Sequence, residues 1–476
     1  MKVINPSSGE IIREFSLQTI EEIKAVITQA RQAFDQGPWP RLSLAERKQF
    51  ILKIGQGILD KAAELAEIET LNTGKPIKET TFMDIPSAAK AFEFMANNFE
   101  KYLEKETLDI EGQAQGRLVR EPLGVAVLII PWNYPLLIAC WKLASALAAG
   151  NTVILKPSSL TPLSALELSK IIKAAGLPEG AVNLVFSSGD VFGKAVCQDS
   201  RIDLISFTGS NEVGRQILEC SSQSVKKLIM ELGGKSASII FKDADLDTAV
   251  NSALTSIFLN QGQMCTAMSR ILVQDSIYDR FTKEFVSKAQ RIKLGPGLDF
   301  ETQMGPLVSD GQRQKVIVAV EKAKSEGAKL LCGGKIPDNS QLKRGFFFEP
   351  TVLAQVTPQM SIFREEAFGP IAVLSKFSTP EEAIALANDS DFGLAASIWT
   401  KDQDLARSTA AKINAGTVWI NTYGMFYNQL PFGGFKQSGF GKELGKEGFL
   451  EYTRLKNIIT DQSAEGKPLV NFWYGF

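Results

Sequence analysis

Short β-branched, apolar runs alternate with segments of helical periodicity from residue 125 to residue 231, and this alternation restricts the fold more than any other feature of the sequence. The runs VAVLII (125–130), TVILK (152–156) and LISF (204–207) are too apolar to be half exposed, as expected of parallel strands that helices cover on both faces. We therefore predict a doubly wound, parallel α/β sheet. Further strands are predicted at 182–186 and 226–231, with helices at 136–149, 162–176, 191–198 and 212–222.

A second alternating block covers about residues 236–435, with strand-like SIIF, RILV, IAVLSKF, SIWT and TVWIN separated by helical segments. Its start, near residues 233–234, is the predicted domain boundary. The region before the first block is helical in pattern over 19–75 and 80–105, and the sequence then becomes polar over 106–122. A chain of 476 residues is long enough for two or three domains.

One uncharged segment, residues 123–141, approaches the length of a membrane span. Pro131 and Pro135 lie at its centre, where they would break a spanning helix. We therefore predict a strand, a loop and a helix here, and no membrane association. The N-terminal MKVINPSSGE lacks a signal-peptide pattern, and five scattered cysteines form no disulfide or zinc framework, so we expect a cytoplasmic protein.

Composition excludes several classes of function. The formal net charge is -1, which gives no reason to expect a nucleic-acid partner. The sequence contains no histidine, which rules out a Ser-His-Asp triad, a Cys-His dyad and a histidine metal site. A general base would have to be a carboxylate with a raised pKa, a lysine with a lowered pKa, or a cysteine.

Three polar residues are candidates for catalysis. Cys265 ends the loop NQGQMC and is a candidate nucleophile, provided that the pocket lowers its pKa or a base takes its proton. Glu231, at the end of the strand in MELGGKS, is expected to face the crevice at the carboxyl ends of the strands. Asn133, between the prolines of PWNYP, could donate its amide N–H to an oxyanion. Each residue, taken alone, is more often structural.

The segment FTGSNEVG (207–214) follows a strand and opens a helix, so its backbone could receive a pyrophosphate, although it is not the GxGxxG fingerprint. Lys156 ends a strand in ILKPS and could reach ribose hydroxyls. Glu366 in EEAFGP could do the same at a second ribose.

The order of these motifs along the sequence resembles that of one known protein family. PWNYP, ILKPS, FTGSNEVG, MELGGKS, NQGQMC, EEAFGP and PFGG…SGFGKELG resemble the motif series of the NAD(P)-dependent aldehyde dehydrogenase superfamily, in its hydrolytic branch. The resemblance extends from INPSSGE to EYTRLK, nearly the whole chain. It implies an aldehyde-dehydrogenase-like α/β fold, with a Rossmann-type dinucleotide-binding domain, an α/β catalytic domain and a small β oligomerisation arm.

The resemblance also implies roles for the three candidates. Cys265 matches the nucleophile that forms a thioester, Glu231 the base that activates water to hydrolyse it, and Asn133 the oxyanion-hole amide. The substrate would be an aldehyde and the cofactor NAD or NADP, with no metal. The expected cofactor-binding residues are Ile129, Ile130, Pro131, Trp132, Lys156, Ser158, Ser159, Gly189, Phe207, Thr208, Gly209, Ser210, Val213, Gly214, Leu232, Glu366 and Phe368.

One departure from the family pattern concerns the cofactor. NAD-preferring members often carry glutamate where this sequence has Ser159. Serine removes repulsion of a 2′-phosphate, and Lys156 remains available to pair with it. We therefore expect NADP to be accepted.

The positions that match the family's substrate tunnel are mostly apolar or aromatic, which favours a hydrophobic aliphatic or aromatic aldehyde. A trimethylammonio- or amino-aldehyde is the alternative, weakened because Phe258 and Phe432 replace tryptophans of the aromatic box in plant members. The matching tunnel positions are Tyr134, Ile138, Trp141, Leu259, Met264, Thr266, Gly424, Phe426 and Phe432.

The implied domains are a dinucleotide-binding domain (1–107 and 123–232), a catalytic domain (233–437), and an oligomerisation arm and tail (108–122 and 438–476). A homodimer or homotetramer is expected, because the apolar NFWYGF tail needs a surface to cover it. Two other interpretations remain open at this point: a CoA-acylating enzyme, which would lack Glu231, and a non-catalytic scaffold, which would not need all three candidates.

Overall fold

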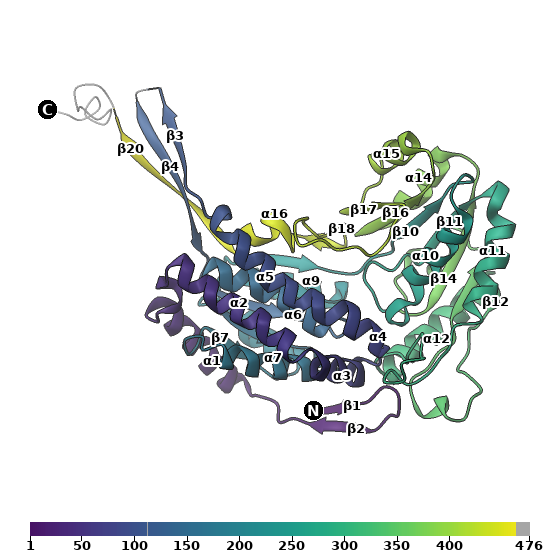
Figure 1. The fold of residues 1–476 in the computed structure, drawn as a ribbon, viewed down its shortest axis with the longest axis horizontal. Helices are drawn as coiled ribbons and strands as arrows, with labels where there is room; N and C mark the ends of the chain where they lie inside the picture. Colours follow the sequence, from purple (N-terminus) through teal and green to yellow (C-terminus); the bar gives the residue numbers. More distant parts are fainter. Residues whose placement is uncertain (112, 463–476) are drawn as a thin grey trace.

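The computed structural model describes residues 1–111 and 113–462. It contains two mostly parallel β-sheets that helices cover on both faces, and a slender antiparallel arm that projects from the first of them (Figure 1). The predicted α/β fold is therefore confirmed. The apolar end of the predicted tail lies outside the described residues.

The first sheet has the strand order β19-β9-β8-β5-β6-β7. The five strands from β9 to β7 in this order are parallel, and the edge strand β19 is antiparallel to β9. Ala126 and Leu128 of β5 face one apolar cluster, and Val125 and Val127 face another, as the period of two in a strand requires. The strands are β5 (Val125–Ile129), β6 (Thr152–Lys156), β7 (Val182–Leu184), β8 (Leu204–Thr208), β9 (Lys227–Glu231) and β19 (Gly439–Phe440).

Helices that follow these strands, and others from the N-terminal region, form the two covering layers. One layer holds α2, α3, α5, α6 and α7, and the other holds α1, α8 and α9. The segment predicted as helical over 19–75 is divided by turns at Gly37-Pro38 and at Lys61. The elements are α1 (Ile20–Asp35), η1 (Trp39–Arg41), α2 (Leu44–Asp60), α3 (Ala62–Thr73), α4 (Ile77–Glu79), η2 (Thr80–Asp84, a π-helix), α5 (Ile85–Tyr102), α6 (Pro135–Ala149), α7 (Leu163–Ala174), α8 (Gly189–Val196) and α9 (Asn211–Ser221).

The second sheet has the strand order β12-β13-β14-β11-β10-β16-β17, and only its edge strand β12 is antiparallel to its neighbour. Helices α12 and α14 lie on one face, and α10 and α11 lie on the other. The elements are β10 (Ala237–Ile240), α10 (Leu246–Phe258), η3 (Leu259–Gly262), β11 (Arg270–Gln274), α11 (Asp275–Ala289), α12 (Asp310–Ser325), β12 (Lys329–Cys332), η4 (Leu342–Arg344), β13 (Thr351–Ala354), α13 (Ser361–Arg364), β14 (Ile371–Phe377), α14 (Pro380–Asn388), β16 (Ala395–Trp399), α15 (Gln403–Ala410) and β17 (Thr417–Ile420).

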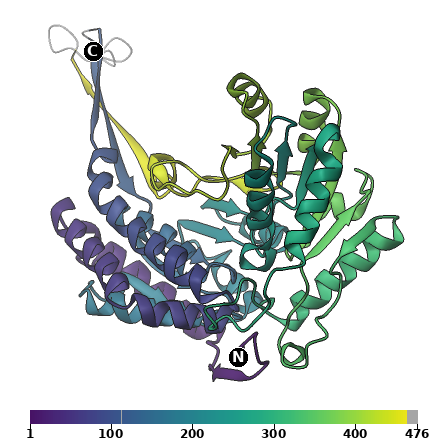
Figure 2. The same cartoon turned by 45° about the vertical axis from the view of Figure 1, so that its right-hand side comes forward.

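The projecting arm is a three-stranded antiparallel sheet in the order β20-β4-β3, and Figure 1 and Figure 2 both show it standing away from the two main sheets. Its strands are β3 (Glu106–Ile110), β4 (Ala114–Pro122) and β20 (Thr453–Asp461). The remaining short elements are the pairs β1 (Lys2–Ile4) with β2 (Ile11–Glu14) and β15 (Phe392–Gly393) with β18 (Phe435–Lys436).

Residues 438–452, at the start of the expected arm and tail, pack against the first sheet. Strand β19 extends that sheet, and α16 (Gly445–Leu450) packs against α5 and α6. Phe449 and Tyr452 are fully buried there, so this segment forms part of the core around the first sheet. The arm begins only with β20.

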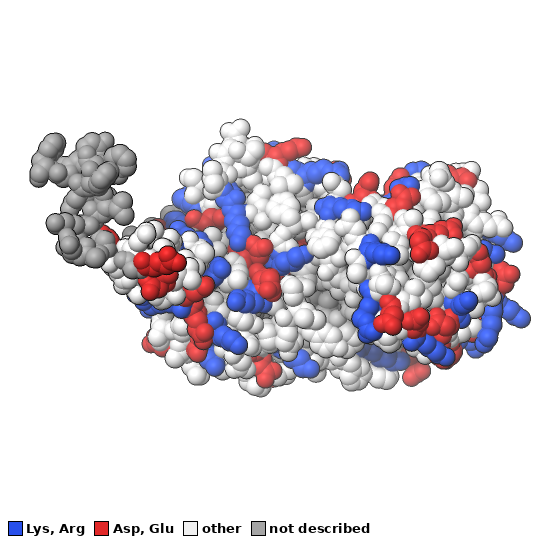
Figure 3. Space-filling view, turned by 90° about the horizontal axis from the view of Figure 1, so that it is seen from above, with Lys and Arg blue, Asp and Glu red and all other residues white. Residues whose placement is uncertain are grey.

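Two other features bear on partners. No helix among the described residues is long and apolar enough to cross a membrane, and residues 123–141 form β5, a turn and the start of α6, as predicted. Basic and acidic side chains are intermixed on the face shown in Figure 3.

Candidate active site

A cleft of about 1130 Å³ opens where the parallel strands of the first sheet end and the second sheet's loops approach them. The register aligns Ile129 of β5 with Lys156 of β6 and with Phe207 of β8, so the strand ends meet at one edge. The turns after these strands, the starts of α8 and α9, and the loop that carries Cys265 all line the cleft. Of the expected cofactor-binding residues, the cleft is lined by Ile129, Ile130, Pro131, Trp132, Lys156, Ser158, Ser159, Gly189, Phe207, Thr208, Gly209, Ser210, Val213, Leu232, Glu366 and Phe368.

Gly214 is the exception. It lies one turn inside α9, and a Cβ atom added there would meet Leu232 Cδ2 at 2.7 Å. The glycine therefore allows α9 to approach the end of β9 closely, and it does not line the cleft.

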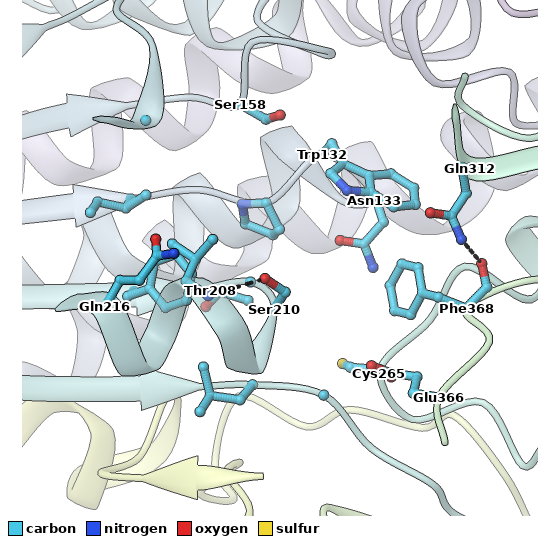
Figure 4. A pocket seen from close by; sticks show the side chains of 18 of the residues that line it. Trp132, Asn133, Ser158, Thr208, Ser210, Gln216, Cys265, Gln312, Glu366 and Phe368 are labelled. Atoms are coloured by element: carbon cyan, nitrogen blue, oxygen red, sulfur yellow. Dashed lines mark hydrogen bonds between the residues drawn. The ribbon is translucent and has the colours of Figure 1, made fainter. Parts of the chain in front are cut away.

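Two helices begin at the cleft. Ser188 caps α8 and Ser210 caps α9, each accepting a hydrogen bond from a backbone N–H in the first turn. Helix N-termini carry partial positive charge and unpaired N–H groups, which suit a pyrophosphate. Figure 4 shows Ser210 and Thr208 on the same side of this cleft.

Lys156 is a buried amine at the end of β6. Its ammonium donates to the Pro157 carbonyl at 3.1 Å, and it forms no ion pair with a carboxylate among the described residues. Burial lowers its pKa to about 8. An amine that faces the cleft without an internal anion fits a ligand rich in oxygen atoms, such as a ribose or a phosphate.

Glu366 and Phe368 approach the cleft from the second sheet's side. Glu366 Oε1 accepts the Gly234 N–H at 3.0 Å, and burial raises its pKa to about 7. The Phe368 and Trp132 rings pack edge to face, with their centroids 5.1 Å apart. Gln312 holds this segment by donating to the Phe368 carbonyl at 2.9 Å (Figure 4), a contact that no local sequence signal predicts.

Cys265 follows a strained loop. Asn260 and Gln261 both have left-handed backbone conformations, with φ of 47° and 57°. Burial, followed by the nearby carboxylates of Glu366 and Glu231, raises the pKa of the Cys265 thiol to about 12. The protein alone therefore keeps this residue as a thiol, and a base or a positive charge must assist its ionisation.

The Asn133 amide points into the same part of the cleft as the Cys265 sulfur (Figure 4). Its Nδ2 donates one N–H to the Gln263 carbonyl at 2.8 Å, which fixes the amide's orientation. The second N–H of that NH₂ group remains for a ligand. An oriented donor next to a thiol is the arrangement that stabilises an oxyanion on a carbonyl under attack.

Glu231 does not face the cleft as expected. It is buried at the end of β9, and a Cβ atom on Gly433 would lie 2.6 Å from its Oε1. The antiparallel strand β19 pairs with the end of β9, so the neighbouring loop covers this carboxylate. Neither of its oxygens has a hydrogen-bond partner among residues 1–111 and 113–462, and burial, followed by the charge of Glu443, raises its pKa well above the usual range.

Sequence reasoning missed a group of buried polar residues behind Glu231. The Lys142 ammonium donates to Glu443 Oε1 at 2.5 Å and to Ser206 Oγ at 2.7 Å. The Tyr452 hydroxyl donates to Ser206 Oγ at 3.3 Å. These residues are far apart in the sequence, and no motif links them.

Only some of the expected tunnel residues line the cleft. Tyr134 and Ile138 line it. Trp141, Phe426 and Phe432 pack on one another, with ring centroids 5.3–6.0 Å apart.

Tyr423, which sequence reasoning missed, contacts two further tunnel positions. Its hydroxyl donates to the Thr266 carbonyl at 3.4 Å and lies 3.9 Å from the Met264 sulfur. Gly424 has open space around it. Leu259 instead lines a separate cavity of about 410 Å³ beside Phe258, Lys288 and Arg291.

A family model described as "Aldehyde dehydrogenase family" matches residues 1–458. The chain belongs to the aldehyde dehydrogenase family. It is similar to "Betaine aldehyde dehydrogenase" of Bacillus subtilis (strain 168), with 44% identity over 99% of this chain and 95% of that protein. It is also similar to "Retinal dehydrogenase 2" of Homo sapiens, with 42% identity over 96% of this chain and 88% of that protein.

A solved structure of betaine aldehyde dehydrogenase from Staphylococcus aureus, in complex with NAD+, resembles this aldehyde dehydrogenase with a TM-score of 0.96 and 40% identity. The match covers 100% of this chain and 93% of that one. The enzyme is therefore an NAD(P)-dependent aldehyde dehydrogenase, and the predicted family, activity and cofactor class are confirmed.

Proposed function

We propose that this enzyme oxidises a hydrophobic aliphatic or aromatic aldehyde to its carboxylic acid, through a thioester on Cys265 that water activated by Glu231 hydrolyses. The observation that carries the proposal is the placement of the Cys265 thiol and an oriented Asn133 amide at one end of a cleft. Tyr134 and Ile138 line the same cleft, and Cys265 packs against the apolar cluster that contains Trp141 and Phe432.

Each of these residues has its own role in the proposed reaction. The Cys265 sulfur adds to the aldehyde carbon, and the resulting oxyanion accepts hydrogen bonds from the free Asn133 N–H and the Cys265 backbone N–H. Loss of hydride from that carbon leaves an acyl group on the sulfur. The thiol's raised pKa means that adding the aldehyde requires removal of its proton.

Glu231 would then take a proton from the attacking water. Burial raises its pKa, and a raised pKa makes the ionised carboxylate a stronger proton acceptor. Its carboxylate must first turn from Gly433 toward the thioester, since it does not line the cleft in this structure.

The bound dinucleotide supplies the hydride acceptor. The capped N-termini of α8 and α9 would hold its pyrophosphate, and Lys156 and Glu366 would bind its riboses. Phe368 and Trp132 would lie beside its nicotinamide ring. Ser159 lines the cleft beside Lys156, so a 2′-phosphate would meet no carboxylate at that position. We infer that both NAD and NADP are used.

A quaternary-ammonium aldehyde is the second candidate, favoured by the aromatic cluster of Trp141, Phe426 and Phe432 and by the similarity to betaine aldehyde dehydrogenases. One contact argues against it. The Lys75 ammonium already lies 3.5 Å from the Tyr134 ring centroid, so one face of that ring is occupied by a cation.

The exposed arm favours self-association. Within the part of the chain that the structure describes, no further strand pairs with the outer strands β3 and β20 of the arm. Five of their apolar side chains are exposed: Leu108, Ile110, Leu455, Ile458 and Ile459. Such a surface is typically covered by another chain. We infer a homodimer or homotetramer in which this arm is buried.

The direct test is the absorbance of reduced nicotinamide over time, with aliphatic, aromatic and trimethylammonio-aldehydes against NAD and NADP, for the wild type and Cys265→Ser. We expect turnover that requires Cys265 and is highest for a hydrophobic aldehyde. A kcat/KM that is highest for the trimethylammonio-aldehyde would refute the proposed substrate class. Undiminished turnover by Cys265→Ser would refute the proposed nucleophile.

A further inference from the structure

Four ionisable side chains lie buried beneath the start of α6 and the nucleophile loop, and the mechanism above uses none of them. They come from α3 and from the segment that joins it to α5: Glu69, Lys75, Glu79 and Asp84. Lys75 donates to Asp84 Oδ2 at 2.5 Å, and both side chains are almost completely removed from solvent. Buried charges of this kind are costly unless each has a specific partner.

The partner of Glu79 is the backbone of the nucleophile loop. Its two carboxylate oxygens lie 3.1 and 3.3 Å from the Asn260 backbone nitrogen, whose N–H they accept. Asn260 has a left-handed backbone, and so has the next residue, Gln261. Without Glu79, this buried N–H would have no acceptor among the described residues, at a backbone conformation that is already strained.

Asn260 in turn holds the oxyanion donor. Its Nδ2 lies 3.2 Å from the Asn133 backbone carbonyl and 3.2 Å from the Gln263 carbonyl. The Gln263 carbonyl is also the acceptor that orients the Asn133 amide, at 2.8 Å. One asparagine therefore bridges the turn that carries Asn133 and the loop that carries Cys265.

The other buried groups support the same region. Glu69 Oε1 accepts the Leu136 N–H at the start of α6, at 3.2 Å. The Lys75 ammonium lies over the ring of Tyr134, the residue after Asn133. Three members of the set, Glu69, Lys75 and Glu79, therefore contact the two segments whose relative position defines the site.

We propose that Glu79 is a positioning residue for the oxyanion hole: it fixes Asn260, and Asn260 sets the distance and orientation of the Asn133 amide relative to Cys265. The Lys75–Asp84 ion pair acts electrostatically on the Glu79 carboxyl, since Lys75 lowers its pKa and Asp84 raises it. This inference rests on the proposed roles of Asn133 and Cys265. A displacement of about 1 Å between reacting groups can lower a rate by roughly 100-fold.

The first test compares Glu79→Leu with Glu79→Gln in steady-state kinetics. We expect Glu79→Leu to lower kcat by roughly 10- to 100-fold and to change KM for aldehyde and cofactor by less than about threefold. Glu79→Gln keeps an oxygen acceptor for the Asn260 N–H and should retain kcat within about threefold of the wild type. Equal loss in both variants, or no loss in Glu79→Leu, would overturn the proposal.

A matched control separates positioning from a general cost of removing a buried carboxylate. Glu167 on α7 is 8% exposed, against 7% for Glu79, and it pairs with Lys170 away from the cleft. Glu167→Leu should leave kcat unchanged within about twofold, whatever its effect on the melting temperature. A kcat loss in Glu167→Leu equal to that in Glu79→Leu would mean that Glu79 acts only through stability.

The deciding measurement is a double-mutant cycle of Glu79→Leu with Asn133→Ala. If Glu79 acts through Asn133, the double variant should be about as slow as Asn133→Ala alone. Multiplicative losses would overturn the positioning proposal but leave the role of Asn133 intact. A wild-type kcat for Asn133→Ala alone would instead refute the proposed oxyanion donor.

If Glu79→Leu does not fold, Asn260→Gly takes its place in the cycle. Glycine accepts the left-handed backbone at this position and removes only the side chain that bridges to Asn133. The same non-multiplicative result is expected, and multiplicative losses would again contradict the proposal.

Discussion

Replacement of Asn133 by alanine tests the oxyanion hole most simply. The Asn133 amide gives one N–H to the Gln263 carbonyl at 2.8 Å and has a second N–H to give to the substrate. Alanine removes both donors. Because Asn260 Nδ2 still lies 3.2 Å from the Gln263 carbonyl, that carbonyl keeps an internal partner. The cost in folding free energy should therefore be small, about 1 kcal/mol.

The loss in the transition state should be much larger. Removal of one oxyanion donor typically lowers kcat by about 10²–10³, which corresponds to roughly 2.7–4 kcal/mol. We expect Asn133→Ala to fall in this range with a melting temperature close to that of the wild type. Steady-state rates of cofactor reduction, with thermal unfolding measured in parallel, give both numbers. A kcat within about fivefold of the wild type in a folded variant would refute the reasoning.

Three further predictions follow from charge and burial. Because the Cys265 pKa is raised to about 12, its thiolate fraction is small near neutrality and grows with pH. The rate of Cys265 alkylation without cofactor, measured by mass spectrometry, should therefore rise about tenfold per pH unit from pH 7 to pH 9, and a rate that levels off near pH 7 would contradict this. Ser159→Glu should lower kcat/KM for NADP roughly 10- to 100-fold by charge repulsion while sparing NAD, and an unchanged ratio would exclude the 2′-phosphate from this position. Lys142→Met should leave Glu443 buried without its cation and lower the free energy of unfolding by about 3–5 kcal/mol. The double variant with Glu443→Gln should recover most of the lost melting temperature, and an unshifted melting temperature in Lys142→Met alone would count against the buried ion pair.

The parts of the molecule that sequence predicted are those with local signals. The strands of the first sheet are apolar runs flanked by turns, and the family motifs lie at their ends. The sequence therefore predicts the sheet and many of the residues that line the cleft. The absence of histidine excludes histidine-based catalytic and metal sites from the composition alone.

The parts that sequence did not predict depend on contacts between distant residues. Lys142 and Glu443 are 301 positions apart, and Glu79 is 181 positions from Asn260. A lysine inside an apolar helix or a glutamate near a helix end carries no sign of its partner. The covered position of Glu231 likewise depends on β19, a two-residue strand too short to have a periodic pattern.

The central claim is that Cys265 carries the acyl group and that Glu231 activates the water that removes it. The most direct measurement is mass spectrometry of Glu231→Gln, denatured within seconds of mixing with aldehyde and NAD. The account predicts that the acyl mass accumulates on the peptide containing Cys265, since hydrolysis is slowed while thioester formation is not. An acyl group on another residue, or undiminished turnover with no adduct, would contradict it.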